Sequence, residues 1–207
     1  MAIPAPVGPW TSLTADEKRA RILAAADELF AREGVDAAMP VLADALGVGV
    51  ASIYRQVGSK DDLVGRLVIA RATALAERFR TAAARPDAWG ALVEATHATV
   101  DDCIDDALSQ SAWDAAAGDS DAVRDARAAA TDALEGLVGS ARRAGALRPD
   151  ATHEDLRLLF CALREVAGIG RDGAHRMAEL VLRGIGRPDC DRAGATTGAP
   201  GCSTVRA

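Results

Sequence analysis

The side chains best suited to a chemical task lie between Ser52 and Lys60, where hydroxyl, phenol, guanidinium, amide and ammonium groups occur within nine positions. Such groups donate hydrogen bonds to phosphate oxygens and to base edges, as nucleic-acid binding requires. Gly49, Val50 and Ala51 precede them and are small enough for close approach to bases. A methyl group of Val50 or Ala51 could contact a thymine methyl. The stretch therefore predicts a contact surface for double-stranded DNA.

Different contacts are expected from different side chains of this stretch. Arg55 could bind a guanine edge or a phosphate, and the sequence leaves both alternatives open. The hydroxyl groups of Ser52 and Tyr54 and the amide of Gln56 can donate to phosphates. The Lys60 ammonium can do the same beside the N-terminal amides of the helix that follows. Contacts to phosphates fix the position of a protein on DNA but do not select a sequence.

Two short helices must position these groups, one expected over 40–46 and a very short one after the turn, within 47–63. Their expected inner faces are apolar: Val41, Leu42, Ala43 and Leu46 in the first, Ile53 and Val57 in the second. Gly47 and Gly49 frame the turn between them. Two short helices joined by a glycine-bearing turn have the layout of a helix-turn-helix.

Capping patterns define the flanking helices. Thr14 and Glu17 have the spacing of a capping box, and Gly34 is suited to end the helix that begins there. Ser59 is expected to cap a further helix that continues to about residue 84, with acids in its first turn.

The segment 42–63 resembles the DNA-binding domain of the tetracycline-repressor (TetR) family of regulators. The matching positions are Ala51, Ser52, Ile53, Tyr54, Lys60, Asp61 and Leu63. The specific resemblance covers about residues 14–65, and the segment 147–156 resembles the family's C-terminal domain more loosely. The resemblance implies an all-α fold, in which an N-terminal three-helix helix-turn-helix domain precedes a C-terminal helical ligand-binding and dimerisation domain. It also implies a homodimer that binds a pseudo-palindromic operator, and a small-molecule effector that releases it.

Two positions depart from the family pattern. Val57 stands where many members have Phe, and alanines occupy the place of the Thr that usually opens the second helix. The missing cap is expected to cost about 1 kcal/mol. Pro40, in the first turn of that helix, partly compensates.

The expected organisation has four parts: a flexible N-terminus (1–13), the helix-turn-helix domain (14–60), the effector-binding and dimerisation domain (61–186), and a disordered tail (187–207). Helices of the second domain are expected at 87–108, 110–117, 120–144, 152–168 and 171–186. Glycines and prolines punctuate them.

Polar or aromatic residues within the apolar C-terminal domain are the candidates for an effector pocket. They are Trp89, Thr96, His97, Cys103 and Trp113. The last two expected helices are apolar over more than one face, which predicts a subunit interface. The candidates for that interface are Leu156, Leu159, Phe160, Leu163, Met177, Leu180 and Val181.

Acidic residues in the expected helix 87–108 suggest a competing class. Asp101, Asp102 and Asp105 have the DDxxD spacing that resembles the diphosphate-binding motif of prenyl-transfer enzymes. His97 shares a helical stripe with Asp101 and Asp105, which could bind a hard metal or form a solvated acidic face. No second acidic cluster and no nucleophile–base pair is found, so the chain is not expected to be an enzyme. A third alternative is a helical dimer that acts through protein partners and has a degenerate DNA-binding element.

Composition sets the remaining bounds. Hydrophobic residues make up 49% of the chain, aromatic residues only 3%, and the formal net charge is −6. This favours helix packing and confines any DNA contact to local positive charge. The chain lacks a membrane-length apolar run, a signal-peptide pattern and a cysteine framework, so a soluble cytoplasmic protein without membrane contact, cofactor or metal is expected. Cys103 and Cys161 are expected to be small core residues.

Overall fold

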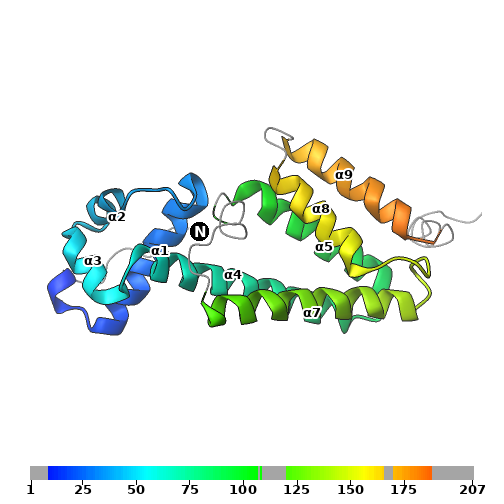
Figure 1. The fold of residues 1–207 in the computed structure, drawn as a ribbon, viewed down its shortest axis with the longest axis horizontal. Helices are drawn as coiled ribbons and strands as arrows, with labels where there is room; N and C mark the ends of the chain where they lie inside the picture. Colours follow the sequence, from blue (N-terminus) through cyan, green and yellow to red (C-terminus); the bar gives the residue numbers. More distant parts are fainter. Residues whose placement is uncertain (1–8, 107, 109–119, 166–169, 188–207) are drawn as a thin grey trace, which may run out of the picture.

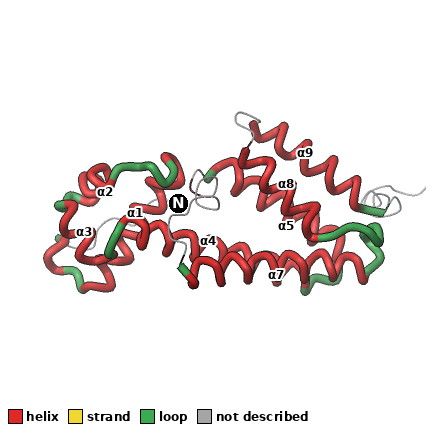
Figure 2. The backbone as a smooth tube through the Cα atoms, viewed as in Figure 1, coloured by secondary structure: helices red, strands yellow, loops and turns green. Residues whose placement is uncertain are grey.

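The computed structural model describes residues 9–106, 108, 120–165 and 170–187, and these form helices without a strand (Figures 1 and 2). The elements are η1 (Trp10–Ser12), α1 (Ala15–Glu33), α2 (Met39–Leu46), α3 (Val50–Val57), α4 (Lys60–Ala83), α5 (Ala88–Asp105), α7 (Asp121–Arg143), α8 (His153–Glu165) and α9 (Gly170–Ile185). The all-α prediction is confirmed. The helix expected at 110–117, Trp113 and the tail from residue 188 lie outside the described residues.

The predicted caps of α1 are present. The Thr14 side chain accepts from the amide of Glu17, whose carboxylate accepts from the amide of Thr14, so both halves of the capping box form. Gly34 ends the helix with a positive φ of 74°. Before α1, Trp10 lies in a single 3₁₀ turn and packs against the N-terminal core, within the segment expected to be flexible.

The inner face of α2 differs from the prediction by one position. Leu42, Ala43 and Leu46 are buried, but Val41 is 44% exposed and Met39 is buried instead. The helix begins at Met39, so the buried positions follow the i, i+3, i+4, i+7 spacing that Val41 does not share. Gly47 ends α2 in the left-handed region, at φ 65° and ψ 36°, which reverses the chain into α3.

The N-terminus of α2 carries the expected capping defect, because the N-cap residue Ala38 makes no side-chain cap hydrogen bond. Ala38 is exposed and has the extended backbone, φ −80° and ψ 133°, that capping residues adopt. We therefore expect Ala38→Ser to raise the free energy of unfolding by about 1 kcal/mol. Urea unfolding followed by circular dichroism measures the gain, with Ala38→Val, which cannot cap, as the control. Equal stability of the two variants would show that the cap does not form.

Helix α4 belongs to two hydrophobic cores. Its first turns, including Leu63 and Leu67, pack with α1–α3, whereas Phe79 lies in the core formed with α5, α7, α8 and α9. The predicted boundary at residue 60 is thus the start of a helix that both domains share. Leu108 and Val123 are buried in the N-terminal core although they follow α5 and begin α7, so the two domains are packed against each other.

The C-terminal domain is built along α4. Helix α7 runs beside α4 in the same direction (Figure 1), and Ser140 Oγ donates to the Ala83 carbonyl at 3.1 Å near the far ends of both helices. Helix α5 returns toward the N-terminal domain, and α8 and α9 cover it (Figure 1). An antiparallel bridge between Leu147 and Gly186 joins the segment before α8 to the end of α9. None of the described helices has both the length and the apolar character needed to cross a bilayer.

Candidate nucleic-acid interface and ligand cavity

Two buried side chains anchor helix α3, and Val50 at its start packs partly buried against the same core. Ile53 and Val57 are buried, with exposed fractions of 0% and 3%, and they anchor the helix to α1 and α2. Outside the buried face, Tyr54 is 40% exposed, and Arg55 is also exposed. Arg55 Nη2 donates to Ser52 Oγ at 3.0 Å, so these two groups share one surface.

The remaining predicted contact residues border the same helix. Gly49 is the N-cap of α3, Ala51 is exposed, and Val50 and Gln56 are half-buried. Lys60 is the first residue of α4, and its Nζ lies 6.0 Å from the centre of the Phe30 ring. The structure thus brings the predicted residues together around α3 and the start of α4. This surface carries hydroxyl groups, an amide and local positive charge, and two helix N-termini supply further N–H donors.

A cavity of about 550 Å³ lies between α4, α5, α7 and α8. Its lining comprises Arg71, Ala74, Leu75, Arg78, Phe79, Thr99, Asp102, Cys103, Asp106, Arg127, Ala130, Thr131, Leu134, Arg157, Phe160 and Cys161. The volume lies within the range of pockets that bind small organic molecules. Both described cysteines, one buried and one half-buried, lie on its wall and are not joined in a disulfide.

Of the predicted pocket residues that the structure describes, Cys103 lines this cavity and the other three do not. The Thr96 hydroxyl donates to the Leu92 carbonyl at 2.8 Å, so it is bound to its own helix. Trp89 packs against Gly186 so tightly that a Cβ there would lie 2.7 Å from Cη2. His97 faces α9. The sequence could not separate these packed polar side chains from side chains that line a cavity.

Ion pairs organise the arginines of the cavity wall. Arg71 binds Asp27 of α1 at 2.5 Å and also binds Asp106. Arg78 Nη1 lies 2.6 Å from Asp102, within α5. Burial opposes the charge of Arg71, but the hydrogen bonds and negative charges of Asp106 and Asp27 outweigh it and raise the pKa of the guanidinium. These arginines were missed from the sequence because each resembles an ordinary charge on the polar side of a helix.

Family models match both domains. A model described as bacterial regulatory proteins of the tetR family matches residues 22–67, and one described as the C-terminal domain of SbtR-like transcriptional regulators matches residues 86–187. The chain belongs to the TetR family. Members are DNA-binding transcriptional regulators that are typically ligand-responsive repressors, homodimeric, and generally not enzymes. Helix α3 lies within the segment that the family's N-terminal model matches.

Solved structures agree with this membership. The TetR regulator SCO0520 of Streptomyces coelicolor is 27% identical, with a TM-score of 0.58 over 82% of this chain and 99% of that one. AmtR of Mycobacterium smegmatis is 22% identical, with a TM-score of 0.59 over 86% and 88% of the two chains. PfmR of Thermus thermophilus is 21% identical, with a TM-score of 0.60 over 81% and 100%. The last two show the shared fold. No curated protein sequence matches the chain significantly.

The predicted interface residues of this TetR-family chain occupy two kinds of position. Leu156, Leu159, Phe160 and Leu163 are buried inside the protomer, so they are core residues and not interface residues. Met177 and Val181 are half-buried, and Leu180 is 56% exposed. Leu158, another apolar residue of α8, is 60% exposed. Periodicity showed that α8 and α9 carry apolar residues on more than one face, but it could not show which face packs inward.

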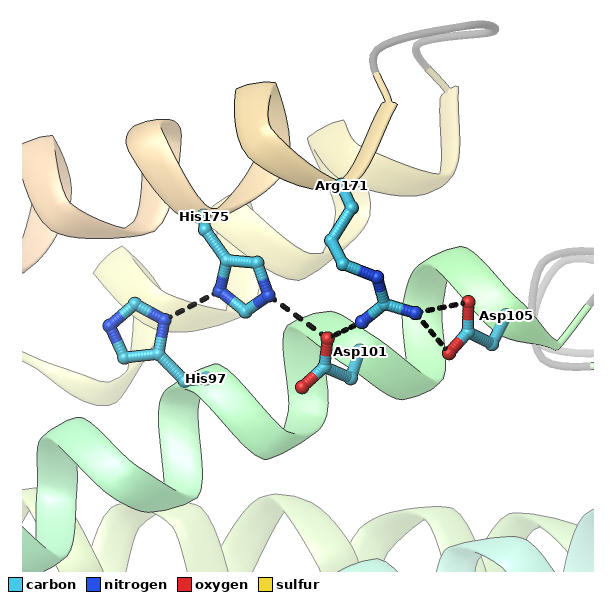
Figure 3. Close-up of polar contacts among 5 residues, drawn as sticks. All are labelled: His97, Asp101, Asp105, Arg171 and His175. Atoms are coloured by element: carbon cyan, nitrogen blue, oxygen red, sulfur yellow. Dashed lines mark hydrogen bonds and ion pairs between the residues drawn. The ribbon is translucent and has the colours of Figure 1, made fainter.

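The predicted acidic stripe of α5 is bound to α9 (Figure 3). Arg171 binds Asp101 and also Asp105, the latter through Nη2 at 2.6 Å. His175 Nε2 lies 2.9 Å from Asp101 Oδ1, and its Nδ1 lies 2.8 Å from His97 Nδ1. No three metal-binding side chains of the described residues are grouped so as to hold an ion. The stripe is an inter-helix polar contact.

The hydrogen bonds of Figure 3 fix the protons on the two rings. Asp101 accepts from Nε2–H of His175, so in the neutral pair His175 Nδ1 accepts from Nδ1–H of His97. The contact between the two Nδ1 atoms has room for one proton only. Charging both rings would bring two N–H groups face to face and break it.

Acidification is therefore expected to destabilise the C-terminal domain. Burial and the charge of His175 lower the pKa of His97 in the folded chain. Histidine in an unfolded chain has a pKa of about 6.5, so just below that pH the unfolded chain binds more protons than the folded chain. The free energy of unfolding therefore falls as the pH falls through that value. Urea unfolding of the wild type and of His97→Asn at pH 7.5 and 5.5 measures the effect, and His153→Asn is the control. The hypothesis fails if His97→Asn keeps the full pH dependence.

Proposed function

We propose that the chain is a repressor that binds a pseudo-palindromic operator as a homodimer and leaves it when a small molecule occupies the cavity. The observation that carries this proposal is the α3 surface, where Tyr54 and Arg55 point outward while Ile53 and Val57 fix the helix. An eight-residue helix is marginal alone in water, so its packing is what keeps the contact side chains in place. A DNA partner also implies that the protein works in the bacterial cytoplasm.

Two copies are needed because one recognition helix contacts only a few base pairs. A twofold dimer places two such helices in successive major grooves about 34 Å apart. We assign the subunit contact to the outer faces of α8 and α9, where Leu158 and Leu180 are exposed. The family typically forms homodimers, which supports a second copy as the occupant of this face.

Removing these leucines tests the assignment. We expect Leu158→Glu combined with Leu180→Glu to yield monomers, because the substitutions would desolvate charge in an apolar contact. Sedimentation velocity measures the oligomeric state, and Val41→Glu provides an exposed aliphatic control in the other domain. If the variant remains dimeric, the subunit interface lies on another surface of the protein.

The effector would act by shifting a population between two states. A ligand releases DNA only if it binds the DNA-incompetent state more tightly than the competent one. The cavity is suited to this because α4, which forms one of its walls, also packs in the core of the DNA-binding domain.

Fluorescence anisotropy tests DNA binding directly. Purified protein is titrated onto DNA from around its own gene and onto scrambled DNA across a salt series. We expect selective binding that weakens with salt. In the Tyr54→Ala/Lys60→Ala variant, binding should weaken on every sequence, and the salt slope should fall by about 1 per lost phosphate contact. If selection from genomic fragments also finds no preferred site, the regulator proposal is wrong, and a dimer acting through protein partners becomes the better hypothesis.

The structure gives less support to the prenyl-transfer alternative. Asp101 and Asp105 are bound to Arg171, and Asp102 is bound to Arg78, so arginines compensate the carboxylates that would hold magnesium. Asp101→Asn combined with Asp105→Asn should leave operator affinity unchanged.

A further inference from the structure

A chain of ion pairs connects the DNA-binding domain to the cavity. Arg71, in the middle of α4, binds Asp27 of α1 through Nη1 at 2.5 Å. Through Nε it binds Asp106, which follows the last residue of α5. The Arg71 side chain is 20% exposed and that of Asp106 is 17% exposed, so this part of the chain is shielded from water. One guanidinium therefore holds α1, α4 and the end of α5 together.

Arg71 and Asp106 also line the cavity, whereas Asp27 does not. A ligand in the cavity can thus reach the group that binds Asp27 without touching the DNA-binding domain. The link between the two domains passes through the cavity wall.

The electrostatics of the wall favour an acidic ligand. Four arginines line the cavity (Arg71, Arg78, Arg127 and Arg157), against two acids (Asp102 and Asp106). Both acids already accept hydrogen bonds, Asp102 from Arg78, and Asp106 from Arg71 and from the amide of Leu108. A cationic ligand would have to compete with these guanidinium groups.

Within the described part of the chain, three arginines of the wall each keep a guanidinium nitrogen that the hydrogen bonds and ion pairs given below do not use. The hydrogen bonds of Arg71 use Nε and Nη1 and leave Nη2, and those of Arg78 use Nη1 alone. Arg157 contacts Glu154 through Nε and Nη2 and leaves Nη1. A carboxylate can bind such groups by charge-assisted hydrogen bonds.

The rest of the wall is apolar. Leu75, Phe79, Leu134 and Phe160 contribute hydrocarbon surface from α4, α7 and α8. A ligand that fills about 550 Å³ beside these residues would combine a hydrocarbon body with its acid group.

We propose that the cavity binds an amphipathic organic carboxylate whose acid group engages Arg71 and weakens its bond to Asp27. The inference rests on the proposed function and deepens it by naming the effector class and the group that transmits its binding. Arg71 of α4 binds Asp27 and so holds α1 against α4. When the carboxylate competes for Arg71, α1 is released, and the two recognition helices lose the fixed spacing that the operator requires.

The test of ligand class compares acids with neutral analogues of the same shape. Decanoate and 4-phenylbutanoate are titrated into the purified full-length protein by calorimetry, as are decanamide and 4-phenylbutanamide. We expect each acid to bind at least about tenfold more tightly than its amide. Arg71→Gln should remove this preference, whereas Arg80→Gln, an exposed arginine on the same helix, should keep it. Equal binding of acids and amides to the wild type would overturn the proposal.

The test of transmission measures operator affinity with and without saturating acid. We expect a weakening of about 5- to 150-fold in the wild type, the usual range for coupled sites. In Asp27→Asn, DNA affinity should already be reduced without ligand, and the acid should change it little. Glu28→Gln is the control, since Glu28 directly follows Asp27 on α1 and takes no part in the pair with Arg71. A full response to acid in Asp27→Asn would overturn the transmission step.

The two failures are separable. Calorimetry detects the carboxylate whether or not the protein binds DNA, so an absence of operator binding would refute the proposed function alone. Operator binding with no preference for acids over amides would refute the ligand class alone. Circular dichroism of Arg71→Gln verifies that this variant is folded. Arg78→Gln is a second variant of the cavity wall, and it should weaken acid binding without releasing α1 from α4.

Discussion

Ile53→Ala is expected to abolish operator binding while the C-terminal domain stays folded. Ile53 is fully buried and holds an eight-residue helix whose other buried residue is Val57. Removing a buried isoleucine side chain to Cβ typically costs about 2–5 kcal/mol, through lost apolar burial and a residual cavity. A helix this short does not persist without packing, so the contact side chains would lose their fixed positions.

Unfolding in urea and anisotropy on operator DNA measure the two parts of this prediction. Val41→Ala is the matched control, because Val41 is a 44% exposed aliphatic residue in the same domain. Its effect should stay within about 0.5 kcal/mol, as for most surface substitutions. The packing argument is refuted if Ile53→Ala binds DNA as tightly as Val41→Ala.

Arg55→Ala is expected to give the largest loss of operator affinity among the exposed residues of α3. A bidentate contact to guanine contributes about 1–3 kcal/mol. A dimer makes the contact twice, so the loss is about 2–6 kcal/mol, or roughly 30- to 20,000-fold in affinity. Arg55 is exposed and its Nη2 donates to Ser52 Oγ at 3.0 Å, which orients the guanidinium on the outer surface.

The same variant decides between the two roles that the sequence left open. If Arg55 binds a guanine, specificity at one position of each half-site relaxes; if it binds a phosphate, all sequences weaken together and the salt slope falls by about 1 per contact. Anisotropy on single-base operator variants at several salt concentrations measures both, with Arg143→Ala, at the far end of α7, as control. A variant that retains wild-type affinity would remove Arg55 from the interface.

The N-terminal domain was predictable because its determinants are local. The capping box of Thr14 and Glu17, the cap at Ser59 and the left-handed Gly47 each act within one helical turn. The spacing of Ile53 and Val57 identified the buried face of α3 in the same way. On the inner face of α2 the error was Val41 in place of Met39: Val41 does not share the i, i+3, i+4, i+7 spacing of the buried residues, and Met39, which does, fell outside the expected helix.

The sequence alone therefore determined the all-α class and the family. It also predicted the contact residues that the structure brings together around α3. Only the tertiary structure decided the cavity and the domain contact, because both depend on packing between helices far apart in the chain. Arg71 meets Asp27 across 44 positions and Asp106 across 35, and His97 meets His175 across 78. Periodicity shows that a helix has an apolar face, but the partner of that face and the polar groups enclosed beside it are fixed by long-range packing.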